Sequence, residues 1–320
     1  MACITQHAVL HVHAATAQEL EAAKAVLQQA QLVANKGRSP EETEYCELQY
    51  VGVPHVRPDD DDGSRSNSSF DVSAYLQHLH TAVLGRLVLA AEAIASTQTV
   101  IQDNVATLPD GALCVADKQI GGKGQRLPFV QYLVSLAAVH AIQAEAKQRL
   151  QGGTLDVRIK WPNDLYSGGL KIGGVLCHSS YRGQLFYVIM GVGLNVSNRE
   201  PTTCVDALVE AEAKQLGLPP PPPVTREVLL AGMMTRLEAM LDVLCQQGFQ
   251  PLEQDYYQAW LHSGQEVRLE EDGQLVAVRV SGLSQHGYLE AVDGQGERYE
   301  LHPDGNSFDF FKGLVRKKTS

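Results

Sequence analysis

The N-terminal part of the chain contains short ordered patterns followed by one polar stretch. Residues 8–13 alternate weakly between hydrophobic and polar positions, which predicts a strand. Thr16 and Glu19 form a capping box, and the apolar residues that follow at helical spacing predict a helix. Residues 54–69 hold prolines, consecutive aspartates and a Ser/Asn-rich run, so they cannot bury apolar surface and we expect a linker.

Hydrophobic periodicity is strongest in the middle of the chain. Pro128 opens a long apolar helix that ends with basic residues, which is the expected asymmetry of helix ends. Strict alternation over residues 155–161 predicts a half-buried strand. The other elements expected here are a helix at 72–84 and strands at 85–91, 172–179 and 185–196, the last two forming a hairpin.

The C-terminal part begins with a proline-rich loop. Five prolines at 219–223 mark this loop, and Thr225 caps a helix with a methionine-leucine stripe typical of core packing. Short strands with glycine-bearing turns follow at 266–270, 275–281, 287–292 and 297–301, which predicts a small β-barrel or half-sandwich. We therefore expect an α+β (α/β-like) protein in three parts: an N-terminal extension with an acidic linker (1–70), a catalytic domain (71–261) and a β cap (262–320).

Composition narrows the class of protein. Hydrophobic residues make up 44% and charged residues 20%, an ordinary globular mixture. No apolar run reaches the roughly 20 residues of a membrane-spanning helix, so no membrane partner is expected. The net charge of −11 argues against a nucleic acid partner. Six scattered cysteines without zinc spacing indicate free thiols, and the N-terminus shows neither signal nor transit peptide, so we expect a cytoplasmic protein.

Candidate chemistry is concentrated between residues 158 and 196. A strand ends abruptly at Asn163 and Asp164, and Lys171 stands beside the Gly173-Gly174 pair. Asn195 follows on a strand with two small residues, and a neutral polar run at 96–98 follows an apolar strand upstream. Each signal alone is weak, since a strand-end aspartate is usually a turn former and a lysine is usually solvated. Phosphate-loop and dinucleotide fingerprints are absent from the sequence.

Taken together, these blocks resemble the biotin–protein ligases, most closely the holocarboxylase synthetases of plant and algal type. The resemblance spans roughly residues 72 to 316. It rests on the runs Lys160-Trp161-Pro162-Asn163-Asp164, Lys171-Ile172-Gly173-Gly174, Gly191-Val192-Gly193-Leu194-Asn195, Ser96-Thr97-Gln98, Pro201-Thr202-Thr203-Cys204 and His302-Pro303-Asp304-Gly305-Asn306. It implies a mixed sheet flanked by helices, like that of class II aminoacyl-tRNA synthetases, and an SH3-like C-terminal β-barrel.

The resemblance also implies a reaction. Biotin and ATP, with Mg²⁺, form biotinyl-AMP and pyrophosphate, and a lysine on the biotin-carrier domain of a carboxylase then takes the biotin. Positive charge is required where the carboxylate meets the phosphate. Because the acceptor brings the nucleophile, no Ser/His/Asp or Cys/His set is needed.

The implied roles are catalysis, metal binding, biotin binding and nucleotide binding. The catalytic residues are Lys171 and Asp164, and Asp164 also orients Mg²⁺ through water. The biotin-binding residues are Ser96, Thr97, Gln98, Gln119, Lys171, Gly173 and Gly174. The residues expected to bind ATP or the adenylate are Lys160, Trp161, Asn163 and Asn195.

One segment departs from the family pattern. The family's Gly-Arg-Gly-Arg loop, the tryptophan after it and a sheet strand are missing between Gln119 and Leu127, where the chain holds only Lys123 and Arg126 as basic residues. That loop covers the adenylate and excludes water in the family, so we expect weakened biotin affinity, leakage of the adenylate or little activity. The alternatives are a catalytically defective isoform that senses biotin or binds carboxylases, and a relative of the lipoate ligases and octanoyl transferases.

Overall fold

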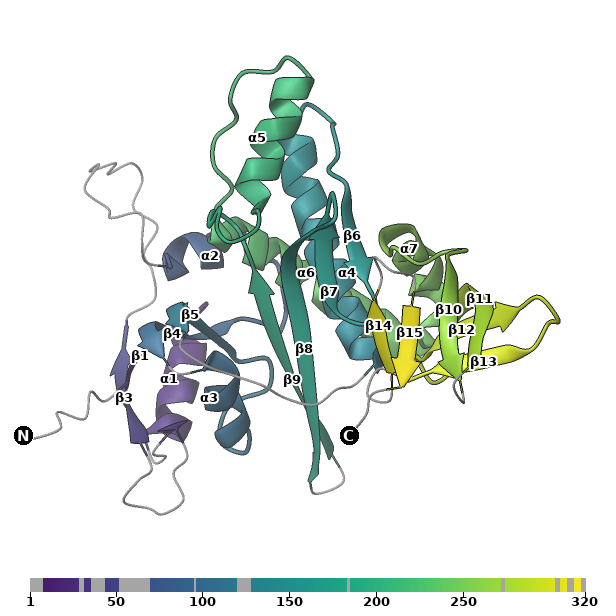
Figure 1. Cartoon of the computed structure of the whole chain (residues 1–320). Helices are drawn as coiled ribbons and strands as arrows, with labels where there is room; N and C mark the ends of the chain where they lie inside the picture. The colour runs from purple at the N-terminus through teal and green to yellow at the C-terminus, as the bar shows by residue number, and fades with distance from the viewer. Residues whose placement is uncertain are drawn as a thin grey trace, which may run out of the picture. The chain divides into compact units, whose positions relative to one another are not determined.

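The computed structural model describes most of the chain (Figure 1). The described ranges are 8–28, 32–35, 44–51, 70–94, 96–119, 128–182, 185–271, 274–302, 306–309 and 314–317. They form two compact units, each discontinuous in sequence. The first holds residues 1–125, 177–191 and 224–239, and the second holds residues 126–176, 192–223 and 240–320.

The first unit is built on a five-stranded mixed sheet. Its strand order is β2 (Val33–Asn35), β3 (Glu44–Tyr50), β1 (Ala8–Ala14), β4 (Leu87–Ile94) and β5 (Leu113–Gln119). β1 pairs in parallel with β3 and antiparallel with β4, and β4 pairs in parallel with β5. The predicted extension therefore shares a sheet with residues of the predicted catalytic domain, and position 70 does not separate two sheets.

Both faces of this sheet are covered by apolar side chains. On one face, inward residues of β1 and β4 such as Leu10 and Leu89 pack with α1 (Ala17–Leu27) and with Val100 of α3 (Thr97–Asp103). On the other face, Val88 packs with Tyr75 of α2 (Val72–His78). Residues that alternate along a strand point to opposite faces, so residues 87–91 of β4 are all hydrophobic because both faces of the strand are covered there.

The helix starts in this unit carry polar caps. Thr16 accepts a hydrogen bond from the Glu19 amide at 3.3 Å, as the capping box predicts. Asp71 and Ser96 cap α2 and α3 in the same way. The helix expected at 72–84 is shorter than predicted, because α2 ends at His78. The amides of residues 82–84 instead donate to the carboxylate of Glu238, at 2.6 to 2.9 Å.

The second unit contains most of a four-stranded antiparallel sheet and a long helix with a buried centre. The sheet order is β6 (Val157–Lys160), β7 (Asp164–Ser167), β8 (Leu170–Arg182) and β9 (Leu185–Leu194). β8 and β9 continue into the first unit. The helix that begins at Pro128 is confirmed as α4 (Pro128–Arg149), and its central residues from Tyr132 to Ala138 are buried.

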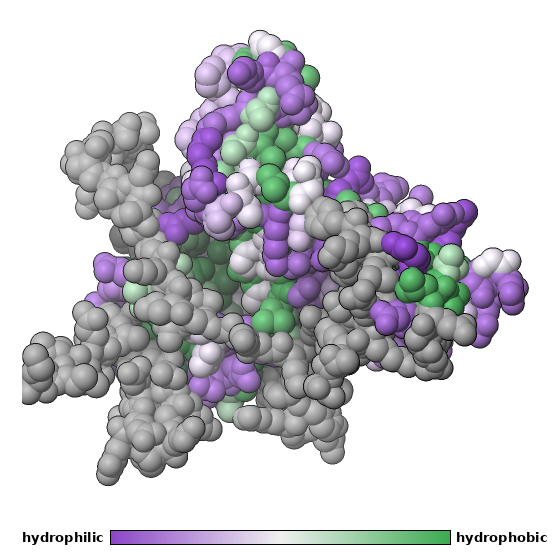
Figure 2. Space-filling view, in the orientation of Figure 1, coloured by the Kyte–Doolittle hydropathy of each residue, from purple (hydrophilic) through white to green (hydrophobic). Residues whose placement is uncertain are grey.

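Three further helices follow β9 along the chain. α5 (Val205–Gln215) was not expected from the sequence, whereas α6 (Arg226–Gln247) follows Thr225 as predicted and α7 (Gln250–Ala259) comes directly after it. Figure 2 shows mainly hydrophilic side chains over the outer end of α5, in line with the exposure of Glu210, Lys214 and Gln215. No helix within the described ranges is both long and apolar enough to cross a membrane.

The C-terminal strands form one small, mostly antiparallel sheet. Its order is β13 (Arg298–Leu301), β12 (Leu289–Asp293), β11 (Gln274–Leu283), β10 (Glu266–Glu271), β15 (Leu314–Lys317) and β14 (Asn306–Asp309). Only the pairing of β10 with β15 is parallel among these neighbours. The four strands expected from the sequence are confirmed as β10 to β13, and β14 and β15 are additions.

Candidate active site

The turn between β6 and β7 carries the Lys-Trp-Pro-Asn-Asp run. Lys160 pairs with Asp164 at the closing end of the β6–β7 hairpin. The Asn163 amide donates to the Lys160 carbonyl oxygen at 3.1 Å, and the Trp161–Pro162 peptide bond is cis. The sequence therefore places three polar side chains at one tight hairpin end, as its turn signals predict.

Asn163 ties this turn to the neighbouring strand β8. Its side-chain Nδ2 donates to the Val175 carbonyl oxygen at 2.6 Å, and the Val175 amide donates to the Asn163 carbonyl oxygen at 2.8 Å. The side-chain nitrogen of Asn163, a residue predicted to bind ATP, is thus already engaged within the protein. Asn163 contributes at least one structural role, which is to fix the position of the turn on the sheet.

Lys171 and Asp164 form an ion pair on β7 and β8. The Lys171 Nζ atom lies 2.5 Å from Asp164 Oδ1, and the side chains are 48% and 25% exposed. Both predicted catalytic residues therefore share one partly open place in the second unit. At this exposure the pair contributes little to stability, about 1 kcal/mol or less. An ammonium held at a solvent-accessible position is free to exchange its carboxylate partner for a ligand's anion.

The Gly173-Gly174 pair allows close approach beside this ion pair. A Cβ atom on Gly173 would lie 2.7 Å from the Gly193 carbonyl oxygen, and one on Gly174 would lie 3.1 Å from Asp164 Oδ1. Side chains at either position would displace β9 or the Asp164 carboxylate. Strand packing therefore requires glycine at 173, and the contact at 174 is tight, in line with the close backbone approach that the sequence predicts.

Asn195 organises the loop that follows β9. Its Nδ2 donates to the Thr203 carbonyl oxygen at 3.2 Å and to Thr202 Oγ1 at 3.3 Å, and Thr202 Oγ1 donates to the Lys171 carbonyl oxygen at 2.8 Å. The loop thus closes over the backbone of Lys171. The amide oxygen of Asn195 is the part of the side chain that remains to accept a ligand's hydroxyl.

Lys160 and Trp161 differ from each other in exposure. Trp161 is only 3% exposed, so its indole lies in the interior, and its predicted contact with ATP stays a prediction. Lys160 is partly exposed, and its Nζ lies 5.7 Å from the ring centroid of Tyr166. Burial and the nearby Asp164 raise the pKa of Tyr166, so this ring remains a neutral phenol beside the lysine.

The remaining predicted residues belong to the first unit. Ser96 is buried and accepts a hydrogen bond from the Thr99 amide at 3.2 Å, where it caps α3. Thr97 and Gln98 occupy the first turn of α3, and Gln119 is the last residue of β5. Ser96 therefore has a structural role as an N-cap besides the predicted contact with biotin.

Gln98 has a partner that sequence analysis missed. Its Nε2 lies 3.1 Å from Nδ1 of His178, which stands on β8 and is only 8% exposed. The two residues are far apart in sequence, and a histidine between apolar strand positions gives no local signal. Because the Gln98 Nε2 atom is a donor, the His178 Nδ1 atom accepts this hydrogen bond. The ring proton of His178 then lies on the Nε2 atom of the histidine.

The described residues do not form a metal site of their own. No group of three or more His, Cys, Asp or Glu side chains converges anywhere in the described ranges. Asp164, the residue predicted for Mg²⁺, already pairs with an ammonium through Oδ1. Within the described residues, Asp164 is thus the one carboxylate predicted for Mg²⁺, and its role toward a water-bound Mg²⁺ stays a prediction.

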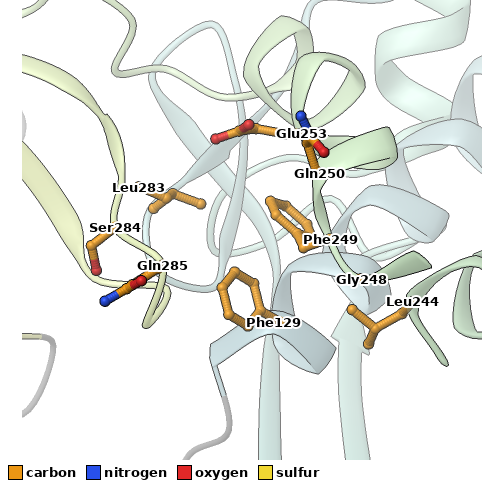
Figure 3. Close-up of a pocket in the computed structure, with 9 residues that line it drawn as sticks. All are labelled: Phe129, Leu244, Gly248, Phe249, Gln250, Glu253, Leu283, Ser284 and Gln285. Atoms are coloured by element: carbon orange, nitrogen blue, oxygen red, sulfur yellow. The ribbon is translucent and has the colours of Figure 1, made fainter. Parts of the chain in front are cut away.

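A cavity of about 380 Å³ lies elsewhere in the second unit (Figure 3). Phe129 and Phe249 lie side by side in it, with ring centroids 4.9 Å apart. None of the residues predicted for biotin or ATP lines it. The other lining residues are Leu244, Gly248, Gln250, Glu253, Leu283, Ser284 and Gln285.

Comparisons with known proteins agree with this arrangement. Residues 123–195, which include the turn and the ion pair, match the biotin/lipoate A/B protein ligase family. Residues 262–313 match the biotin protein ligase C terminal domain. Biotin–protein ligase 2 of Arabidopsis thaliana is 40% identical over 291 residues, which cover 82% of this chain and 84% of that protein. The chain belongs to the biotin–protein ligase family.

Other relatives support the same family assignment. The chloroplastic biotin–protein ligase 1 of Arabidopsis thaliana is 38% identical over 312 residues, covering 89% of this chain and 82% of that protein. A mutant biotin protein ligase of Aquifex aeolicus, solved in complex with biotin, superimposes with a TM-score of 0.50 at 20% identity. The superposition covers 67% of this chain and 94% of the Aquifex protein. It shows that the fold is that of the biotin ligases. The predicted α+β fold with a C-terminal β cap is confirmed.

Proposed function

We propose that this chain is an ATP-dependent biotin–protein ligase that attaches biotin to carboxylases. In the first step a carboxylate oxygen of biotin attacks the α-phosphorus of ATP, pyrophosphate leaves and biotinyl-AMP forms. In the second step the amine of an acceptor lysine attacks the acyl carbon, AMP leaves and the amine gives up a proton. The observation that carries the proposal is the exposed Lys171–Asp164 ion pair beside Gly173 and Gly174, in a member of this family.

Lys171 supplies the positive charge for the first step. Two anions must approach each other, and a preorganised ammonium lowers the cost of that approach. Asp164 Oδ1 lies 2.5 Å from Lys171 Nζ, so the ammonium is already positioned before the substrates bind. The biotin carboxylate and the α-phosphate then compete with Asp164 for the same three donors of the ammonium.

Neighbouring groups of the second unit bind the adenylate. The amide oxygen of Asn195 accepts from a ribose hydroxyl, and partly exposed Lys160 faces the phosphates. Gly174 leaves the surroundings of the Lys171 ammonium free of a side chain, since a Cβ atom there would lie 3.5 Å from Lys171 Nζ. Mg²⁺ enters as part of the substrate, as the Mg·ATP complex, because Mg²⁺ usually keeps waters and phosphate oxygens as ligands.

Residues of the first unit bind the ureido ring of biotin. The ring is neutral, and Ser96, Thr97, Gln98 and Gln119 offer neutral donors and acceptors that suit it. His178 holds the Gln98 amide through its Nδ1 at 3.1 Å, which fixes the orientation of that amide. We add His178 to the biotin-binding residues for this reason.

The acceptor is the biotin-carrier domain of a carboxylase in the cytoplasm. The nucleophile comes from that domain, so the enzyme need only hold biotinyl-AMP and exclude water. Residues 120–127, where the family's adenylate loop is missing, lie outside the described ranges. The sequence departure supports faster leakage of biotinyl-AMP, and rapid filtration of enzyme loaded with labelled biotin and ATP measures it.

Biotinylation of a purified carrier domain tests the proposal. The chain, ATP and biotin are incubated with the carrier domain, and the product is read on a streptavidin blot. Labelling by the wild type that is lost in Lys171→Ala supports the proposal. Lys214→Ala, a change at an exposed lysine of α5, is the matched control and keeps its labelling. Folded wild-type protein that gives no labelling favours the alternative, an inactive isoform that binds biotin or carboxylases.

A further inference from the structure

Trp161 joins the catalytic turn to the C-terminal part of the second unit. Its indole Nε1 donates to the Tyr132 hydroxyl at 2.8 Å, and that hydroxyl donates to the Gly287 carbonyl oxygen at 2.5 Å. Its backbone amide donates to Nε2 of His262 at 2.8 Å. Two separate hydrogen-bonded paths therefore leave one residue of the Lys160–Asp164 turn and end on residues after position 261.

The His262 ring is fixed by its surroundings. It is fully buried, and its Nδ1 lies 3.0 Å from Oε1 of Gln265. Because the Trp161 amide can only donate, Nε2 accepts and the ring proton lies on Nδ1, which donates to Gln265. Burial lowers the pKa of His262 to about 4, so the ring stays neutral and keeps its acceptor at physiological pH.

The backbone places His262 beside the turn. Trp260 forms a parallel bridge with Ile159 of β6, and the Leu261 amide donates to the Ile159 carbonyl oxygen at 2.9 Å. The segment that enters the C-terminal sheet thus runs alongside the end of β6. An amide donor at Trp161 that lost its acceptor would be buried without a partner, which is unfavourable and promotes displacement of the turn.

A displacement of Trp161 would also move the residues of the turn that are proposed to act on the substrates. Asn163 is bonded to Lys160 across the turn and to Val175 on β8, and Asp164 pairs with Lys171. We propose that His262 is a positioning residue of the ligase site: its Nε2 fixes the backbone of Trp161 and thereby the turn that presents Asn163 and Asp164. This inference rests on the proposed function, and it assigns to the start of the C-terminal sheet a role in nucleotide binding.

Two variants separate positioning from general stability. His262→Gln places an amide oxygen near the position of Nε2 and keeps the acceptor, whereas His262→Asn is too short to reach the Trp161 amide. In biotin-dependent ATP–pyrophosphate exchange, we expect His262→Asn to raise the KM for ATP about tenfold, the effect of about 1.4 kcal/mol. His262→Gln should stay within about threefold of the wild type. His286→Asn, at an exposed histidine, is the matched control and leaves the KM unchanged.

Amide hydrogen exchange gives a second readout that needs no activity. Faster exchange at Trp161 and Asn163 in His262→Asn, but not in His262→Gln, supports the inference even if wild-type protein shows no ligase activity and the proposed function fails. If His262→Asn lowers the melting temperature but leaves both the KM for ATP and the exchange at the turn unchanged, His262 is merely structural and the inference is wrong. If His262→Asn does not fold, a KM for ATP in His262→Gln that is raised tenfold also overturns it.

Discussion

The α-carbon of Gly173 faces the Gly193 carbonyl oxygen so closely that a Cβ atom on Gly173 would lie 2.7 Å from it. The reverse does not hold, because a Cβ on Gly193 would meet no atom within 4 Å. A side chain is therefore sterically disfavoured at Gly173 but not at Gly193, although the two glycines lie on neighbouring strands. The contact from Gly173 is to backbone, which cannot move away as a flexible side chain can.

This asymmetry gives a matched pair of variants. We expect Gly173→Ala to push β8 from β9 next to Lys171 and to lower kcat/KM for biotin at least tenfold, the effect of about 1.4 kcal/mol. Gly193→Ala should keep its kcat/KM within about threefold. Pyrophosphate exchange measured on both proteins checks this. Equal activity of the two variants would show that the close approach has no bearing on the site.

Asp164→Asn tests the role of the ion pair. The change removes the charge that holds the Lys171 ammonium but leaves the shape of the side chain. We expect the rate of biotinyl-AMP formation to fall at least tenfold, with little change in melting temperature, because pairs this exposed contribute little to stability. Single-turnover formation of biotinyl-AMP measures the rate.

Asp156→Asn is the control for that variant. Asp156 also pairs with a basic residue, Arg158, at 2.8 Å, but it lies just before β6 and outside the turn. It should form biotinyl-AMP at the wild-type rate. A wild-type rate in Asp164→Asn would exclude Asp164 from catalysis.

The buried ring of His262 predicts a pH dependence of stability. Its pKa is about 4 in the folded state and 6.5 as the ordinary value, so the unfolded state binds a proton more readily between these values. The contribution to stability is complete above pH 6.5 and is lost as the pH falls toward 4, by about 3 kcal/mol in all. His262→Gln has no ring to titrate and should show a shallower loss.

Urea unfolding at several pH values measures this effect. Trp161 and Trp260 are the two tryptophans of the chain, and both lie in the same unit as His262, so their fluorescence reports on that unit. The difference in unfolding free energy between wild type and His262→Gln should shrink as the pH falls from 7 to 5. A difference that stays constant over this range would contradict the prediction.

Glu238 predicts a stability effect in the first unit. Burial raises the pKa of this carboxyl, but the amides of Leu84, Ala82 and Val83 outweigh burial and lower it overall. Glu238→Gln keeps an oxygen but loses the charge, so we expect the free energy of unfolding to drop by about 1–3 kcal/mol. Thermal unfolding followed by circular dichroism checks this against Asp242→Asn, an exposed position on the same helix. Equal melting temperatures would be evidence that the three bonds contribute nothing.

Local signals in the sequence predicted the local structure well. The Thr16–Glu19 capping box starts α1, and Pro128 starts α4. The paired glycines at 173 and 174 mark a close backbone approach, as their spacing suggested. These features depend on neighbours within a few residues, so the pattern of the chain contains the information.

Features that depend on distant partners could not be predicted. His262 and Trp161 are 101 positions apart, and Gln98 and His178 are 80 positions apart, so neither histidine gave a signal of its own. The end of α2 was missed because Glu238 is about 155 positions away. Its carboxylate accepts hydrogen bonds from the amides of residues 82–84. The hydrogen bond from the Trp161 indole to Tyr132, 29 positions away, gave no local signal either, and the ATP-binding role of Trp161 stays a prediction.

The central place of β1 has a consequence for biosynthesis. β1 is the first described strand to leave the ribosome, yet it lies between β3 and β4 in the finished sheet. It cannot gain its antiparallel neighbour until residues 87–94 have emerged. A nascent chain halted before that point would carry a strand with an unsatisfied edge, which invites pairing with other chains. The edge of β1 that faces β4 is therefore covered only after residues 87–94 have been synthesised.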